Sequence, residues 1–297
     1  MRGNMKTVVI YNPAAGIKGD NPIDKIITHL EQRQQNYTIY ETEIHRGPIE
    51  ILKDIQYSFD CLVVSGGDGT VSDAVQGLHN LDLKIPLLII PSGTTNDIAA
   101  NIGMSHDTNT ILETLENSKI RSVDFGLIDD KTCFTYSLTF GNFTEVTYKT
   151  PQQLKNWMGY KAYVLYGFLT FRRIKKYKLQ IETDSKSFDG DFVFGGVTNS
   201  KSVGNIFFFK DDVVSLDDGL FEVLLIKRPR SIKHLRMILN GLISHDYNNE
   251  MFVLLKTKSI QFSGDRKIDW NIDGEFGGSL KSITAVNQHK GLQIYSE

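Results

Sequence analysis

A glycine-rich segment with one carboxylate is the part of the chain whose residues point most directly to chemistry. It reads Gly66, Gly67, Asp68, Gly69 and Thr70, between an apolar run of strand type and a run with helical spacing. Glycines let backbone N–H groups approach a ligand closely, and a helix start favours an anion, so the segment suits phosphate. Asp68 would repel phosphate unless a cation lay between them, and Mg²⁺ meets that need. From spacing alone, a turn in which Asp68 or Thr70 merely caps the helix stays open.

Other polar loops also follow strand-like runs. Asn12 follows the first run, Thr42 closes the second, and Thr94 and Asp97 lie in the loop 91–99 after a later one. Ligands of open α/β sheets bind outside the carboxyl ends of the strands, so we expect these residues at one edge of a sheet. Such residues are also ordinary helix caps, and the loop 91–99 alone is a weak signal.

The first 125 residues alternate between strands and helices. Strand-like runs are Thr7–Tyr11, Tyr37–Glu43, Cys61–Val64 and Ile85–Ile90, and helical runs are Asn21–Gln35, Pro48–Ser58, Val71–Leu78, Asp97–Ile102 and Thr108–Asn117. Short apolar strands between helices predict a parallel sheet covered on both faces. We therefore expect a three-layer α/β nucleotide-binding domain over residues 1–125, to which the C-terminal residues 288–297 could return.

Residues 126–287 predict a mainly antiparallel β domain, a sandwich or an open barrel. Several short strand-like runs, Cys133–Phe140, Ser259–Phe262 and Lys267–Ile272 among them, alternate with turn signals. The turn signals are Asp189-Gly190, Asp218-Gly219, Ser263-Gly264 and Asp273-Gly274. Two helical stretches, Gln152–Arg173 and Ser231–Leu242, interrupt the pattern.

The composition fits a soluble globular protein. The 297 residues are 40% hydrophobic and 23% charged, with a net charge of -2, which gives no support to nucleic-acid binding. The chain lacks the apolar core of a signal peptide and an apolar run of about 18 residues, so we expect no transmembrane helix. Two cysteines, Cys61 and Cys133, predict no disulfide framework. These features indicate a cytoplasmic protein that meets a membrane only from the side.

Three motifs together carry a family resemblance. The motifs Asn12-Pro-x-x-Gly16, Gly66-Gly-Asp-Gly-Thr70 and Pro91-x-Gly-Thr-x-Asn-Asp97-x-Ala99 resemble the diacylglycerol kinase catalytic-domain family in its bacterial soluble branch. Sphingosine kinases share the same core, and the resemblance covers essentially the whole chain. The glycine-aspartate-glycine element alone is shared with NAD kinases and resembles phosphofructokinases, and the third motif narrows the family to lipid kinases.

The resemblance implies a nucleotide site and catalytic acids. In that family ATP sits in the cleft between the two domains, and the matching residues are Asn12, Thr42, Gly66, Gly67, Asp68, Gly69, Thr70 and Thr94. Asp68 would hold the catalytic Mg²⁺, and Asp97 and Asp124 match further acidic positions. For Asp124, a hinge carboxylate in a local hydrogen-bond network stays an equal alternative.

The resemblance also implies a general base and a second metal. Asp273-Gly274-Glu275 taken alone is a hairpin signal, but the glutamate of this motif is the family's general base, which makes Glu275 our candidate. Ser215, Asp218 and Leu220 match a structural Mg²⁺ site, with a plain turn as the alternative interpretation. Two departures, Ile17 after Gly16 and an uncharged residue near Tyr166, replace lysines of relatives and bear on the lipid substrate.

Two basic runs suit an anionic membrane surface. The first is Arg172, Arg173, Lys175, Lys176 and Lys178, after an aromatic-rich stretch, and the second is Lys227, Arg228, Arg230, Lys233 and Arg236. A solvated helix face is the alternative. The sequence therefore predicts an ATP- and Mg²⁺-dependent lipid kinase acting on diacylglycerol or a similar neutral lipid at a membrane surface, with a homodimer left open. An NAD kinase-like enzyme and a non-catalytic nucleotide- or lipid-binding regulator are the competing hypotheses.

Overall fold

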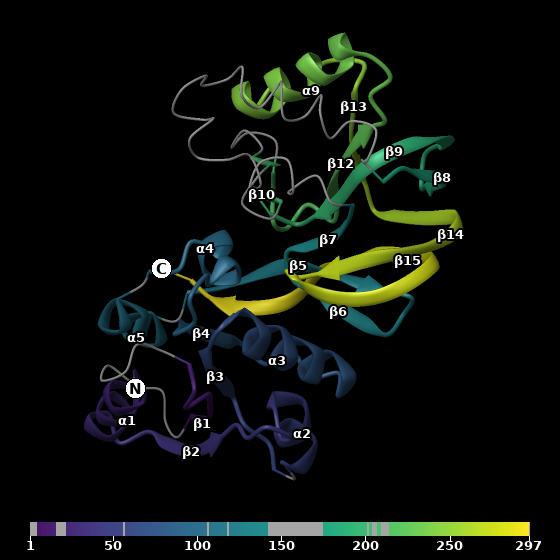
Figure 1. Ribbon diagram of the computed structural model, residues 1–297. Coiled ribbons are helices and arrows are strands. Elements are labelled where there is room, and N and C mark those ends of the chain that lie inside the picture. Colours follow the sequence, from purple (N-terminus) through teal and green to yellow (C-terminus); the bar gives the residue numbers. More distant parts are fainter. Residues whose placement is uncertain are drawn as a thin grey trace.

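The N-terminal half is built on four parallel strands. The structure, a computed structural model, describes residues 5–15, 22–55, 57–105, 107–117, 119–141, 175–200, 202–203, 207–208 and 214–296. The elements of this half are β1 (Lys6–Tyr11), α1 (Pro22–Gln32), β2 (Asn36–Glu41), α2 (Pro48–Asp54), β3 (Cys61–Gly66), α3 (Asp68–Asn80), β4 (Leu87–Pro91), α4 (Asp97–Ile102) and α5 (Thr108–Asn117). The strand order is β4-β3-β1-β2, and every pair is parallel (Figure 1). The four loops expected at the site therefore leave the sheet at one edge.

The C-terminal half is rich in antiparallel strands. Its elements are β5 (Ile120–Ile128), β6 (Thr132–Phe134), β7 (Ser137–Phe140), β8 (Tyr177–Thr183), β9 (Ser187–Thr198), β10 (Ser202–Val203), β11 (Phe207–Phe208), β12 (Phe221–Lys227), α9 (Ile232–Ser244), β13 (Phe252–Thr257), β14 (Ser259–Ile272) and β15 (Glu275–Tyr295). Strands β7, β9, β8 and β14 pair in a closed ring. Aromatic side chains fill this core, and the rings of Phe140 and Trp270 lie 5.2 Å apart.

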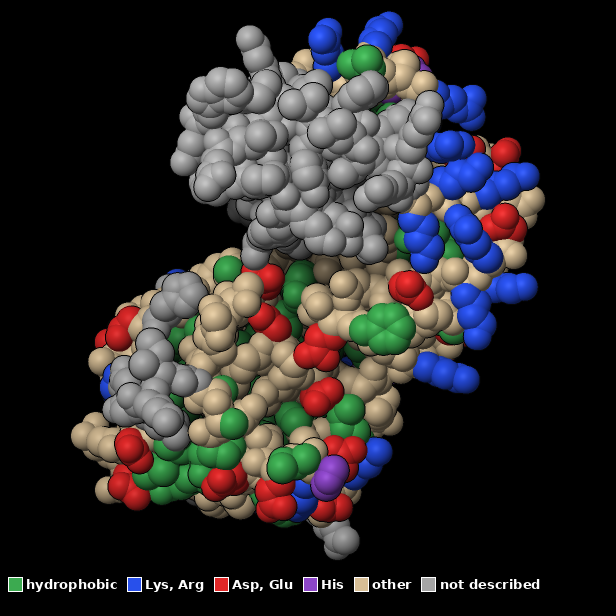
Figure 2. All heavy atoms as spheres, viewed as in Figure 1, with side chains coloured by type: hydrophobic (Ala, Val, Ile, Leu, Met, Phe, Trp, Pro, Cys, Tyr) green, Lys and Arg blue, Asp and Glu red, His purple; other side chains and the backbone are tan. Residues whose placement is uncertain are grey.

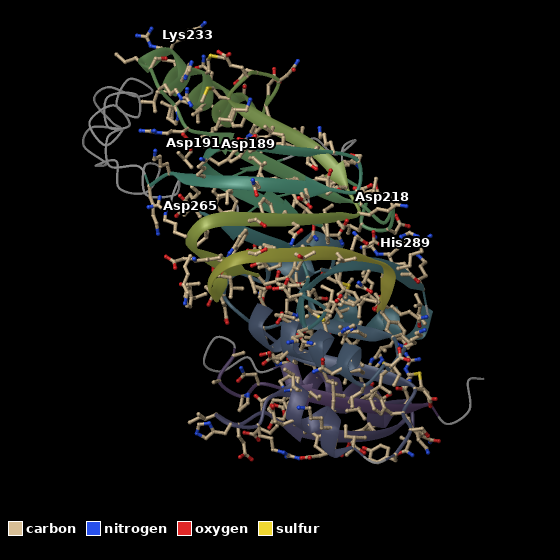
Figure 3. The ribbon with its side chains drawn as sticks, turned by 90° about the vertical axis from the view of Figure 1, so that its right-hand side faces the viewer. Asp189, Asp191, Asp218, Lys233, Asp265 and His289 are labelled. Carbon is tan, nitrogen blue, oxygen red and sulfur yellow. The ribbon has the colours of Figure 1, made fainter. Side chains whose placement is uncertain are left out.

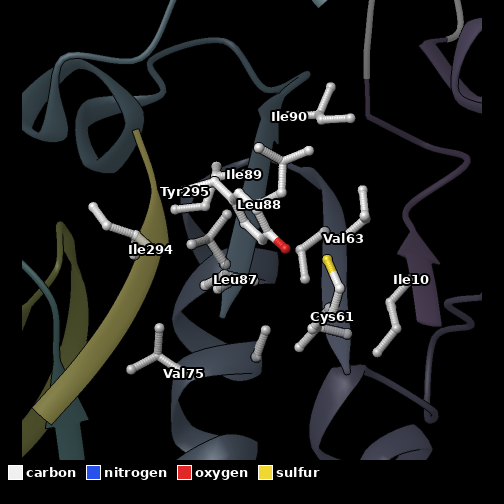
Figure 4. Packing of buried hydrophobic residues seen from close by; sticks show 14 of the residues in the cluster. Ile10, Cys61, Val63, Val75, Leu87, Leu88, Ile89, Ile90, Ile294 and Tyr295 are labelled. Atoms are coloured by element: carbon white, nitrogen blue, oxygen red, sulfur yellow. The ribbon is translucent and has the colours of Figure 1, made fainter. Parts of the chain in front are cut away.

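The last strand connects the two halves. β15 starts in the β-rich half, and its far end pairs in parallel with β4 through Ile294 and Leu87. Figure 4 shows Ile294 and Tyr295 packed beside the residues of β4 and β3, including Leu87 and Cys61. Because β15 pairs with strands of both halves, one continuous sheet runs through the described part of the chain.

Three expectations about single elements are wrong. Asp189-Gly190 does not end a strand but lies inside β9, and Ser263-Gly264 lies inside β14, where the pairing with β15 shifts register. A Gly inside a strand can mark a bulge in place of a turn, as the register shift after Ser263 indicates, whereas at Asp189-Gly190 the pairing with β8 continues without a shift. The expected strand Cys133–Phe140 is interrupted at Thr135 and Tyr136, between β6 and β7.

One predicted helix is found and another cannot be placed. The expected helix Ser231–Leu242 is α9, capped by the Ser231 hydroxyl, which accepts a hydrogen bond from the His234 backbone N–H. The expected helix Gln152–Arg173 lies outside the described residues, as do Gly16, Ile17 and Tyr166. Within the described residues, no helix is both long and apolar enough to cross a bilayer.

Candidate active site

The glycine loop is the tight turn between β3 and α3. Gly66 ends β3 and α3 begins at Asp68. A Cβ atom on Gly66 would lie 2.5 Å from the Thr70 Cβ atom, so a side chain at this position would displace Thr70. The Asn12 backbone N–H donates to the Ser65 carbonyl at 2.9 Å, and the Asn12 amide lies 3.4 Å from the Thr70 hydroxyl. Asn12 therefore lies beside the loop, within reach of Thr70.

A second glycine loop lies against the first. A Cβ atom on Gly93 would be 2.5 Å from the Gly67 Cα atom, so only glycine allows this approach. Asn96 holds the second loop in shape, because its side-chain amide donates to the Gly93 carbonyl and accepts from the Gly93 N–H, both at 2.8 Å. Asn96 adopts a left-handed backbone with φ of 54°, which asparagine tolerates better than most residues.

Asp68 connects the starts of two helices. Its Oδ1 atom accepts a hydrogen bond from the Ile98 backbone N–H at 3.0 Å. Asp97 is the first residue of α4, so the Asp68 carboxylate lies at the first turn that carries Asp97. Thr94 is exposed in the same loop, whereas Thr42 follows the edge strand β2, two strands away from β3.

The Asp273 turn reaches the site from the β-rich half. The Asp273 carboxylate is buried and accepts hydrogen bonds from the backbone N–H groups of residues 135, 136 and 137 and from the Thr135 hydroxyl, at 2.7–3.0 Å. Burial raises the pKa of Asp273, and these donors act in the opposite direction. The Ser72 hydroxyl of α3 lies 3.3 Å from the same carboxylate, so the turn is fixed to the helix of the glycine loop.

Glu275 stands over the glycine loop. Its Oε1 atom lies 3.3 Å from the position that a Cβ atom on Gly69 would take. Glu275 opens β15 and is exposed, so its carboxylate is accessible to a substrate. The structure thus brings together Asp68, Asp97 and Glu275, although they come from three separate parts of the chain.

The electrostatics of the buried Tyr136 reflect these acids. The pKa of Tyr136 is raised by burial and then by Asp273, Asp97, Asp68 and Glu275, in that order. Tyr136 was not among the predicted site residues because it lay inside an expected strand. Its only signal was an aromatic residue between two polar ones, Thr135 and Ser137.

The electrostatics around Asp68 and Glu275 favour a cation. No described Lys, Arg or His forms an ion pair with Asp68 or Glu275. The pKa of Asp73 on α3 is raised by burial and by the nearby Glu50 and Glu275. Figure 2 shows Asp and Glu side chains on the face between the N-terminal helices and the β-rich half.

A divalent ion that also bound a nucleotide phosphate would fit this donor set. The described residues contain no cluster of three or more acidic, His or Cys side chains arranged to hold a metal alone. Mg²⁺ is usually bound by one or two carboxylates together with substrate phosphates, so Asp68 at the glycine loop suits it.

Asp124 lies away from the glycine loop, at the junction of the two halves. Its carboxylate is fully buried and accepts hydrogen bonds from the backbone N–H groups of Gly219 at 2.6 Å and Lys290 at 2.7 Å. The His289 Nδ1 atom is 3.2 Å away. Both carboxylate oxygens therefore connect β5 to the loop before β12 and to a bend of β15, which matches the hydrogen-bond-network alternative left open above.

The predicted second metal site has internal partners already. Asp218 accepts a hydrogen bond from the Leu220 backbone N–H at 3.0 Å and forms an ion pair with Lys256 at 3.2 Å. The Ser215 hydroxyl donates to Asp217 at 2.8 Å. Figure 3 shows Asp218 and His289 at one edge of the β-rich half. In the arrangement described, a divalent ion at Asp218 would have to displace this ammonium.

Basic side chains gather on a different face. Figure 2 shows Lys and Arg side chains along one flank of the β-rich half. The second predicted run lies at the end of β12 and the start of α9, where Lys227, Arg228 and Arg230 line a groove with Phe188 and Phe192 at its apolar wall. Of the first run, Lys175, Lys176 and Lys178 are described and exposed.

The chain is similar to bacterial kinases over almost its whole length. A family model, the diacylglycerol kinase catalytic domain, matches residues 6–128. The diacylglycerol kinase of Bacillus subtilis (strain 168) is 30% identical over 289 residues, covering 96% of this chain and 94% of the relative. The diacylglycerol kinase of Staphylococcus aureus (strain Newman) is 30% identical over 295 residues, covering 97% of this chain and 91% of the relative.

Solved structures show the same fold. A crystal structure of a diacylglycerol kinase from Bacillus anthracis str. Sterne matches with a TM-score of 0.74 at 20% identity, covering 100% of this chain and 98% of that one. The likeness confirms the predicted order of an α/β half followed by a β-rich half. The three-motif resemblance and the match along the chain lead to one conclusion: the protein belongs to the diacylglycerol kinase family and is a lipid kinase.

Proposed function

We propose that the protein transfers the γ-phosphate of ATP to the hydroxyl of diacylglycerol and releases phosphatidic acid. The observation that carries the proposal is the convergence of Asp68 and Glu275 on the glycine loop, with no basic partner for either among the described residues. The curated relatives named above are diacylglycerol kinases, which supports this acceptor.

The site residues have separate roles in this proposal. The backbone of Gly66–Gly69 and the start of α3 contact the phosphates, with Asn12, Thr70 and Thr94 beside them and Thr42 further along the sheet edge. Asp68, with Asp97 next to it, would hold Mg²⁺, which neutralises phosphate charge during transfer. Glu275 accepts the proton of the lipid hydroxyl as that oxygen attacks the γ-phosphorus.

Asp124 acts through position and not through contact with substrate. Its carboxylate connects β5 to Gly219 and Lys290, and its carbonyl accepts a hydrogen bond from the Asn199 amide at 2.7 Å. The Asn199 carbonyl in turn accepts a hydrogen bond from Asn101 of α4 at 2.8 Å. This chain of contacts supports a role in holding α4, and with it Asp97, against the β-rich half.

We also propose a two-domain division with a boundary near residue 125. The first domain would be a three-layer α/β unit of the NAD kinase and phosphofructokinase type, supported by the packing of α1 on α5 and of α2 on α3. The second would be a β-sandwich, supported by a core drawn from β7, β8, β9, β12 and β14. The end of β15 would return to the first domain, as its pairing with β4 indicates.

The lipid would be reached at an anionic membrane surface, from the cytoplasm and without a span. The exposed Lys227, Arg228 and Arg230 support this, because basic residues near such a surface contribute about 1 kcal/mol each. Salt-insensitive binding to vesicles, or equal binding to neutral and anionic vesicles, would contradict it. Homodimer formation is a further proposal, which sedimentation at several protein concentrations tests.

One assay decides on the acceptor. Purified protein receives Mg²⁺ and ATP labelled at the γ-phosphate, together with diacylglycerol, a sphingoid base, NAD or no acceptor. We expect label in phosphatidic acid. Label in NAD would replace the proposal with an NAD kinase, and ATP binding without transfer to any acceptor would favour a regulator.

A further inference from the structure

The Tyr136 side chain is a neutral hydrogen-bond donor placed among the acids of the site. The residue is 6% exposed and lies between β6 and β7, in the β-rich half. Its ring packs with the core of the N-terminal half, so Tyr136 lies across the junction of the two halves. Its backbone N–H donates to Asp273, and its carbonyl accepts from the Asn199 N–H at 3.2 Å. The backbone is therefore fixed at both polar atoms.

The Tyr136 hydroxyl has no acceptor among the described residues. Its Oη atom lies 3.0 Å from the position of a Cβ atom on Gly274, next to Glu275 in the chain. Here burial and four carboxylates raise the pKa of Tyr136, so the phenol keeps its proton at neutral pH. A proton donor beside Gly274, next to the proposed base Glu275 and without an acceptor among the described residues, is suited to an oxygen of the substrate.

We infer that Tyr136 donates a hydrogen bond to an oxygen of the phosphoryl group during transfer. This inference rests on the proposed function. The phosphoryl group must pass between a nucleotide held at Asp68 and an acceptor hydroxyl held at Glu275, and the surroundings of Tyr136 include both acids. The carboxylates of Asp68 and Glu275 cannot donate when ionised, so Tyr136 supplies a donor where phosphoryl oxygens carry charge.

The chemistry balances without proton loss from the tyrosine. The bond between the γ-phosphorus and the oxygen that bridges it to ADP breaks, and a bond from the acceptor oxygen to phosphorus forms. The acceptor proton passes to Glu275, and Tyr136 keeps its own proton throughout. Its effect is therefore on the charge of the transition state and not on the number of protons transferred.

The test is Tyr136→Phe, which removes the hydroxyl and keeps the ring. We expect kcat to fall about 100-fold, as for the loss of one preorganised donor, while the KM for ATP changes by less than about threefold. Tyr177→Phe removes a hydroxyl from another buried tyrosine, in the core of the β-rich half, and should leave kcat unchanged. A kcat of Tyr136→Phe within about threefold of wild type, with an unchanged thermal midpoint, would overturn the inference.

A binding measurement tests the role of the Tyr136 hydroxyl independently of the acceptor. ADP with Mg²⁺ and aluminium fluoride mimics the phosphoryl group in transfer and needs no lipid. Tyr136→Phe should bind this complex at least about tenfold more weakly than wild type does. Both proteins should bind a non-hydrolysable ATP analogue equally well. Equal loss for both ligands, or for neither, would count against the inference. If wild type phosphorylated no lipid at all, the proposed function would fall, and this measurement would still decide on Tyr136.

Discussion

Glu275 and Gly69 face each other across the junction of the two halves. The Oε1 atom of Glu275 lies 3.3 Å from the place of a Cβ atom on Gly69, in the first turn of α3. The Asp273 turn supports this approach, because it is hydrogen-bonded to Ser72 of the same helix, and a Cβ atom at position 69 would make the contact tight. A candidate base and a phosphate-binding loop are thus held by one set of contacts.

Glu275→Gln should stop catalysis without unfolding the protein. The amide keeps the shape of the side chain but cannot accept the acceptor proton, so we expect kcat to fall by a factor of about 10² to 10⁴. The side chain is exposed, so the thermal midpoint should stay unchanged. Steady-state kinetics and thermal melts measure both, with Glu113→Gln, an exposed acid on α5, as the control. Wild-type turnover by Glu275→Gln would exclude Glu275 as the base.

Gly69→Ala should separate activity from stability. The new methyl group would push against Glu275, and small displacements of a reacting group cost up to about 100-fold in rate, so kcat should fall at least about tenfold. Alanine favours a helix over glycine by up to about 1 kcal/mol, so the melting temperature should not fall.

Gly77→Ala on the same helix is the matched control. There a Cβ atom would lie 2.7 Å from the Leu52 side chain, so this variant should lose stability and keep its activity while folded. If Gly69→Ala kept full activity, the short distance between Glu275 and the glycine loop would not be required for catalysis.

Asp273→Asn should unfold more easily than wild type. Every described partner of the carboxylate is a donor, and an amide would turn its own N–H₂ group toward some of them. Hydrogen bonds to charged groups contribute about 1.5–3 kcal/mol each, so we expect a loss of about 3 kcal/mol in the free energy of unfolding. Urea denaturation measures it, with the exposed Asp265→Asn as control. A loss as small as that of the control would show that the turn tolerates the amide.

The sequence predicted the loops of the site better than their partners. Gly66–Thr70 was readable because three glycines between an apolar strand and a helix suit an anion. The loop at Gly93 was a weak signal until its motif was taken together with the other two. The contact of Gly67 with Gly93 requires β3 and β4 to be neighbours in the sheet. The alternation of strands and helices predicts parallel strands, but it does not fix which strands are neighbours. Local patterns thus identify the pieces, and the sheet order brings them together.

Tyr136 and the pair of Glu222 and Lys256 were out of reach of the sequence. Tyr136 lies in a short break between β6 and β7. The residue types in this break do not differ from those of a strand, so one continuous strand was expected. Glu222 lies within the apolar strand β12, and its partner Lys256 lies on β13. Their meeting depends on the register between these strands, which no local pattern encodes.

Asp124→Asn tests the two roles left open for this residue. Its carboxylate holds the backbone N–H groups of Gly219 and Lys290, so the substitution should lower the free energy of unfolding by about 2–3 kcal/mol. Activity per folded molecule should change by less than about threefold at a temperature where the variant is folded. Asp129→Asn, an exposed acid that accepts one such bond from Thr284, is the control. A large fall in kcat with unchanged stability would instead assign Asp124 a direct part in catalysis.

The buried Glu222 should make stability depend on pH. Burial raises the pKa of Glu222 from 4.5 to about 7, and Lys256 at 3.1 Å acts in the opposite direction. Because the folded protein binds this proton more tightly than the unfolded chain, the stability from this group is full below pH 4.5 and is lost as pH rises to about 7. Glu222→Gln, unfolded in urea at several pH values, should lack this part of the pH dependence. An unchanged profile would mean that Glu222 titrates normally.

Lys256→Met should show what the ammonium does for the two acids beside it. It leaves ionised Glu222 without a cation, so we expect a loss of about 3 kcal/mol at pH 8 and a smaller loss at pH 5.5, where Glu222 is protonated. Adding Glu222→Gln should recover most of the loss, while Lys258→Met, an exposed lysine nearby, should cost little. Mg²⁺ added to Lys256→Met tests the prediction for Ser215, Asp218 and Leu220. If the ion restored stability, the ammonium and a metal would compete for Asp218, and if it did not, a metal site there would lose its support.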